Sequence, residues 1–125
     1  MGFFWFILFI EMQIKVLDEE NNIVEMVSGK VLIRNGQDAL DLMGEAEMQD
    51  LVLQEHNFEA DFFDLKNGKL DEVLQKFTNY QVRLAIVGDF EKFKDSNLKD
   101  FIFESNNGGN YLFVSSVGEV LKRWI

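Results

Sequence analysis

The sequence predicts a single α/β domain built on one mixed sheet, with a β-hairpin first and then helices alternating with largely parallel strands. Three observations predict it. A length of 125 residues fits one domain. The hydrophobic share of 47% and the charged share of 27% are typical of a globular chain. Apolar residues alternate with a period of two near the start of the chain. Further on, short apolar runs typical of strands alternate with apolar stripes at helical spacing. Strands that are joined through helices pair in parallel through right-handed crossovers.

The hairpin opens the domain. Residues 13–17 alternate as a strand, which places Ile14 and Val16 on one face. The polar run at 18–22 predicts a turn, and residues 23–27 return as the second strand. A short third extended run is expected at 31–34.

A helix, a strand and a second helix follow. Residues 37–48 carry an apolar stripe at helical spacing, and residues 51–53 are typical of a buried parallel strand. A polar loop at 55–61 contains the only histidine. The next helix is marked by apolar residues at i, i+3, i+4 and i+7, which are Leu70, Val73, Leu74 and Phe77.

Residues 82–87 are the clearest strand. Ser96 is expected to cap the helix that follows, with Leu98, Phe101 and Ile102 turned inward. The asparagine- and glycine-rich run at 106–110 predicts a turn before the last strand at 111–114.

The last helix is expected to start with a capping box formed by Ser116 and Glu119. Its inward residues would be Val117, Val120, Leu121 and Trp124.

The first eleven residues form an apolar leader that ends at Glu11. As a helix it would span about 15 Å, whereas a membrane crossing needs about 20 residues. The leader also lacks the basic start and cleavage site of a secretory signal. Three interpretations stay open: an extra start before a domain at 12–125, an element packing on the domain or on a second copy, and a membrane-surface anchor.

Several ordered blocks of the chain resemble a family of small bacterial proteins catalogued as domain of unknown function 4180. The blocks are residues 61–65, residues 72–77 with Asn79 and Tyr80, residues 84–90 and residues 100–106. The resemblance covers residues 12–124 and leaves the leader outside. It implies no particular activity.

The layout of a hairpin followed by alternating helices and strands is similar to the STAS domains of anti-sigma-factor antagonists. That similarity implies a partner-binding switch, many of which carry a phosphorylatable Ser or Thr at a helix start after a central strand. The matching region here, residues 58–70, has neither residue type, so no phosphate switch is expected there.

Composition excludes several function classes. No cysteine is present, so disulfides, thiol nucleophiles and thiolate zinc sites are excluded, and one histidine excludes a multi-histidine metal centre. The net charge of −10 argues against nucleic-acid binding. Residues 1–60 carry −9 of that charge, either as a solvated face or as a docking patch for a basic partner. The sequence favours a cytoplasmic domain.

Ligands of open α/β sheets collect at the carboxyl ends of the strands. The candidate rim for a partner or ligand at those ends is Glu55, His56, Asp61, Phe62, Phe63, Asp64, Gly88 and Asp89. His56 with its neighbouring carboxylates could bind a divalent metal or act in acid–base chemistry. Asp61 and Asp64 equally suit helix starts.

Three weaker alternatives concern the same edge. Ser115 or Ser116 could form a triad with His56 and Asp89, although no strained Gly-x-Ser-x-Gly turn surrounds either serine. Residues 108–109 could offer backbone N–H groups to an anion, but they also suit a plain turn. Phe62 and Phe63 are adjacent, so one could be exposed as a contact residue, or both could be partly buried.

The leading hypothesis is a non-enzymatic, STAS-like binding or regulatory domain with a protein partner, no cofactor and no assigned catalytic or metal-binding residue. The alternative is a small enzyme or metal-dependent hydrolase that uses His56 and the acidic loop. A homodimer stays open.

Overall fold

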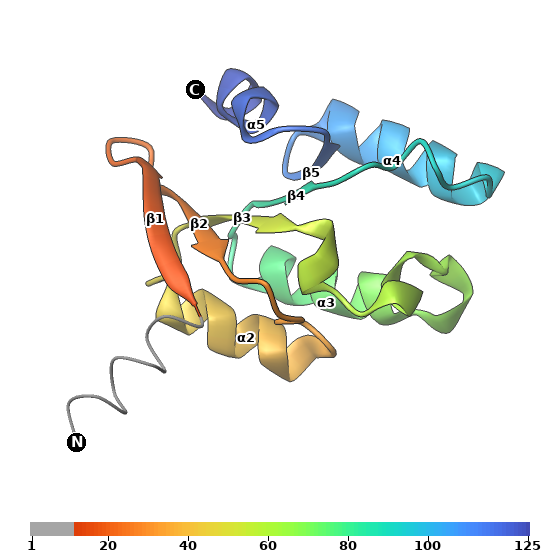
Figure 1. The fold of residues 1–125 in the computed structure, drawn as a ribbon, viewed down its shortest axis with the longest axis horizontal. Helices are drawn as coiled ribbons and strands as arrows, with labels where there is room; N and C mark the ends of the chain where they lie inside the picture. Colours follow the sequence, from red (N-terminus) through yellow and green to blue (C-terminus); the bar gives the residue numbers. More distant parts are fainter. Residues whose placement is uncertain (1–11) are drawn as a thin grey trace.

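The computed structural model describes residues 12–125, which form one five-stranded mixed sheet (Figure 1). The strands are β1 (Gln13–Asp18), β2 (Ile23–Val27), β3 (Asp50–Gln54), β4 (Leu84–Val87) and β5 (Tyr111–Val114). They lie side by side in chain order. β1 pairs with β2 antiparallel, and every later neighbour pairs in parallel. The predicted fold class is confirmed.

Four α-helices connect and follow these strands. They are α2 (Gly36–Glu45), α3 (Lys69–Asn79), α4 (Ser96–Gly108) and α5 (Val117–Trp124). Short 3₁₀ turns lie between β3 and α3, namely η1 (Glu55–Asn57), η2 (Ala60–Phe63) and η3 (Leu65–Asn67). Because each parallel strand lies next to its predecessor, right-handed crossovers bring α2, α3 and α4 to one face of the sheet. α5 packs on the other face, opposite α2 and α3 (Figure 1).

The larger core lies between the sheet and the three crossover helices, and it is rich in phenylalanine. Seven rings form a connected chain of contacts with centroids 5.4 to 6.3 Å apart. These rings belong to Phe58, Phe62, Phe63, Phe90, Phe93, Phe101 and Phe113. Aromatic pairs of this kind stabilise a core beyond the area they bury.

Phe62 and Phe63 are both buried, so the alternative in which one of them is exposed as a contact residue is wrong. They lie on η2, a tight 3₁₀ turn, rather than on an α-helix. Phe63 fills the space between Phe58 and the pair Phe90 and Phe93, which keeps its ring away from solvent.

The smaller core joins the opposite sheet face to α5. Val120 and Trp124 of α5 are buried against strand residues such as Val52 and Leu112. The Trp124 indole Nε1 donates a hydrogen bond to the Gly109 carbonyl at 2.7 Å, which ties the end of α5 to the end of α4.

The α4 boundaries differ from those that the sequence predicts. Asp95, not Ser96, is the N-cap, because its carboxylate accepts hydrogen bonds from the amides of Asn97 and Leu98. Residues 106–108 are helical rather than a turn, and α4 ends at Gly108, with Gly109 as its C-cap at a φ of 85°. The predicted Ser116 cap is confirmed, since its Oγ accepts from the Glu119 amide at 3.2 Å. The reciprocal half of the predicted capping box does not form, because the Glu119 carboxylate lies against the Ser115 hydroxyl.

Two other segments near the start differ as well. The first helix ends at Glu45 rather than at Met48, because Glu47 and Met48 both adopt positive φ values. Residues 31–34 form only an isolated bridge between Ile33 and Phe58.

The leader interpretations concern residues 1–11, which lie outside the described residues. Within residues 12–125, no helix is long and apolar enough to cross a membrane.

Candidate functional site

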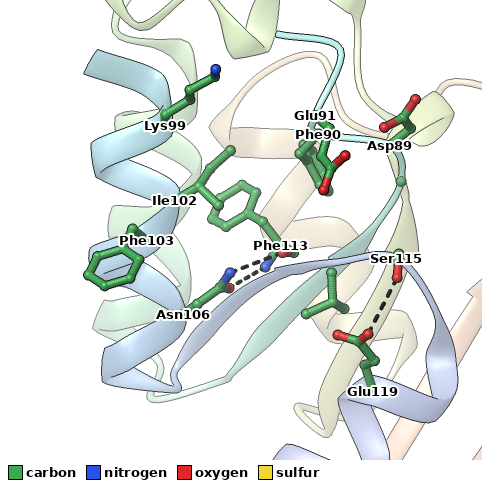
Figure 2. A pocket seen from close by; sticks show the side chains of 12 residues that line it. Asp89, Phe90, Glu91, Lys99, Ile102, Phe103, Asn106, Phe113, Ser115 and Glu119 are labelled. Carbon is green, nitrogen blue, oxygen red and sulfur yellow. Dashed lines mark hydrogen bonds between the residues drawn. The ribbon is translucent and has the colours of Figure 1, made fainter. Parts of the chain in front are cut away.

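The main hollow of the carboxyl edge is a cleft between α4 and the segments that follow β4 and β5. We call it the α4 cleft. It has a volume of about 1070 Å³. Figure 2 shows α4 on one side and the side chains of Asp89, Glu91 and Glu119 on the other. A cleft at this edge is where an α/β sheet of this topology places a ligand.

One wall is a single face of α4. Lys99, Ile102, Phe103 and Asn106 follow at i, i+3, i+4 and i+7, and we call these four residues the α4 stripe. Phe103 is 68% exposed. Leu98 is buried in the larger core and Ile102 packs against that core, so the stripe runs along the margin of the helix face that covers the sheet.

Asn106 fixes this wall to the floor. Its side-chain amide donates to the Phe113 carbonyl at 3.1 Å, and its Oδ1 accepts from the Phe113 amide at 2.8 Å (Figure 2). Phe113 is buried and makes edge contacts with Phe90 and Phe101. The floor is therefore apolar and held in place by hydrogen bonds.

The opposite wall is acidic. It carries the exposed carboxylates of Asp89, Glu91 and Glu119, which we call the acidic rim. Glu119 lies 3.5 Å from the Ser115 hydroxyl, which can donate to it. Among residues 12–125, Lys99 is the one basic side chain that lines the cleft.

A second, smaller hollow of about 410 Å³ lies between the ends of β3 and β4 and includes His56. We call it the His56 hollow. The His56 Nε2 lies 2.9 Å from the Ser28 carbonyl. Glu55 forms an ion pair with Lys92 at 2.5 Å and accepts a hydrogen bond from the Asp89 amide at 3.3 Å.

The residues of the predicted rim do not lie together, because the structure places them at two different hollows and outside both. Glu55, His56, Phe63 and Gly88 line the His56 hollow, and Gly88 also lines the α4 cleft together with Asp89.

Asp61, Asp64 and Phe62 line neither hollow. The Asp61 carboxylate accepts a hydrogen bond from Lys69 at 2.7 Å, and this bond raises the pKa of Lys69. Asp64 accepts from the Lys66 amide at the start of η3. Phe62 belongs to the larger core.

The side chains of the proposed metal site and triad contact other groups in the structure. No group of three or more histidine or carboxylate side chains within residues 12–125 is arranged to hold a metal ion. Ser116 caps α5, Ser115 faces Glu119 and His56 faces Ser28, so the described contacts of these side chains do not form a triad. The Gly109 amide donates to the Ser105 carbonyl, as expected at a helix end.

The α4 stripe is the part of the site that sequence reasoning misses. Its signal is present, because the four residues have helical spacing. The asparagine- and glycine-rich composition of residues 106–110 predicts a turn, which leaves Asn106 out of the helix. Ile102 packs against the larger core as predicted, and it also lines the cleft.

A family model described as "Domain of unknown function (DUF4180)" matches residues 18–124. No curated protein matches the chain, and no solved structure matches it. The matched span includes the α4 cleft and the His56 hollow, so both are parts of the family domain.

Proposed function

We propose that the chain, which belongs to the DUF4180 family, is a non-enzymatic, cytoplasmic binding module that holds a protein partner at the carboxyl edge of its sheet. The observation that carries the proposal is Phe103. Its ring is 68% exposed beside a cleft with an apolar floor. Large aromatic side chains at such places are frequent anchors of protein interfaces.

The contacts of the candidate catalytic groups support binding rather than chemistry. Glu55 pairs with Lys92, Asp61 with Lys69, and His56 contacts a backbone carbonyl. Each of these side chains therefore has a structural role that explains its position.

The layout gives independent support for this class of function. Consecutive strand order with three crossover helices on one face is similar to the STAS domains, which bind protein partners. A likeness of layout supports the class of function and not the identity of the partner. Without Ser or Thr at residues 58–70, the proposed module does not depend on phosphorylation of that segment.

Affinity capture from the source cells tests the proposal. The full chain, Phe103→Ala and Tyr80→Ala are compared as baits. Tyr80 is a matched control because it is also an exposed aromatic residue, but it follows α3 near the opposite edge of the sheet. We expect one partner to be retained by the wild-type and Tyr80→Ala baits.

The same partner should bind Phe103→Ala about tenfold or more weakly, as the loss of an interface anchor predicts. Equal retention by Phe103→Ala and the wild-type bait would contradict the proposal.

A further inference from the structure

We infer that the α4 cleft takes a basic, amphipathic segment of the partner protein. An apolar side chain of that segment packs on Ile102 and Phe103, and its lysine or arginine side chains face the acidic rim. This inference rests on the proposed function and specifies the chemistry of the partner.

The charges of the cleft favour a positively charged segment. The three carboxylates of the acidic rim are exposed, and within residues 12–125 none of them forms an ion pair. Among the described residues that line the cleft, only Lys99, on the opposite wall, has the reverse charge. The net charge of −10 over the whole chain adds a long-range attraction for a basic partner. The same carboxylates repel a nucleic-acid backbone.

The apolar part of the cleft selects an amphipathic segment over a purely charged one. Ile102 is half-buried and lies next to the buried ring of Phe113, and the exposed ring of Phe103 lies at the outer margin of the cleft (Figure 2). A side chain placed there would remove apolar surface from water on both partners.

The size of the cleft favours a peptide segment over a small molecule. Its volume of about 1070 Å³ is at the upper limit of small-ligand pockets, which hold about 300–1,000 Å³. The α4 stripe covers two turns of the helix, which is enough surface for a short peptide segment that lies along it.

Fluorescence anisotropy with three labelled peptides tests the inference on the full chain. The first repeats Lys, Leu, Phe and Lys. The second has Glu in place of each Lys, and the third has Ser in place of each Leu and Phe. We expect the first peptide to bind at least about tenfold more tightly than either of the others.

Variants locate the binding. Asp89→Asn with Glu91→Gln should weaken binding of the first peptide about tenfold, and Phe103→Ala should weaken it by a similar factor. Lys99→Gln should tighten it, because a repelling charge is removed. The matched control is Glu19→Gln with Glu20→Gln, which removes two exposed carboxylates from the β1–β2 turn at the opposite edge of the sheet. Its effect should stay within about twofold.

Equal weakening by the control pair would show attraction to overall charge and would overturn the inference. Equal binding of the first and second peptides would also overturn it. Either result leaves the Phe103-dependent capture of a partner intact, so failure of the inference differs from failure of the proposed function.

Discussion

Among single residues, Gly88 occupies the point where the α4 cleft and the His56 hollow meet. A Cβ atom at this position would lie 2.6 Å from the Glu55 Cβ. Glu55 is itself held by Lys92 and by the Asp89 amide. The absence of a side chain at Gly88 therefore lets Glu55 lie close to the backbone at residue 88. From there Glu55 holds the amide of Asp89, the first residue of the acidic rim.

Gly88→Ala should reduce the free energy of unfolding by about 1–3 kcal/mol, because an overpacked site must shift its neighbours. Urea unfolding measures it. Gly44→Ala in α2 is the control, since nothing lies within 4 Å of its added Cβ. That variant should be neutral or more stable by up to about 1 kcal/mol, as expected for Gly→Ala in a helix. Equal stability of Gly88→Ala and the wild type would refute the close approach.

A second residue-scale prediction concerns pH. The hydrogen bond from the Arg34 guanidinium lowers the pKa of Asp38 below its usual value. A carboxylate with a lowered folded-state pKa adds stability above its unfolded pKa of about 3.9, and this contribution is lost as the pH falls through the folded value.

Asp38→Asn should therefore melt below the wild type at about pH 7, and the difference in Tm should shrink at about pH 3 and below. Thermal unfolding at both pH values checks this. A difference in Tm that grows on acidification would contradict the assignment.

At the scale of elements, short apolar runs bounded by turn residues were readable from the sequence. β2 and β5 have the predicted bounds, because buried strands between polar turns allow little freedom of register. α4 was harder to read, since local asparagine and glycine preferences oppose a helix at residues 106–108. The two hydrogen bonds between Asn106 and the Phe113 backbone link these residues to β5, and such a long-range contact is invisible in a single sequence.

The candidate site, like the fold, could be predicted from the sequence only in part. The carboxyl edge, Gly88 and Asp89 follow from strand order, which hydrophobic patterns predict. The α4 stripe depends on how α4 packs against β5, and a single sequence does not show that packing.

β4 is the element whose burial tests the sheet order. It lies between β3 and β5, and Leu84 is buried in the larger core. Leu84→Ala should cost about 2–5 kcal/mol of unfolding free energy, as is typical of large-to-small core changes. Val16→Ala on β1 is the matched control, because Val16 is 59% exposed, and it should cost less than about 0.5 kcal/mol. Similar costs for both variants would place β4 at an edge.

At the scale of the whole molecule, residues 12–125 supply a core on each face of the sheet. Deleting residues 1–11 should therefore leave a folded domain. Circular dichroism during urea unfolding should show one cooperative transition with a midpoint close to that of the full chain. Loss of cooperativity would show that the leader is structural.

The molecule offers two acidic surfaces to a basic partner. One is the acidic rim of the α4 cleft. The other is the first half of the chain, where residues 1–60 carry a net charge of −9. Among residues 12–125, only the first combines carboxylates with an exposed aromatic ring beside an apolar floor, so we assign the partner to it.

The most direct test is amide NMR mapping of the full chain during titration with the protein that it captures. We predict shifts concentrated at residues 88–91, 99–106 and 113–119, which include the walls and floor of the α4 cleft. Shifts confined to the β1–β2 hairpin and α2, with these three segments unchanged, would contradict it.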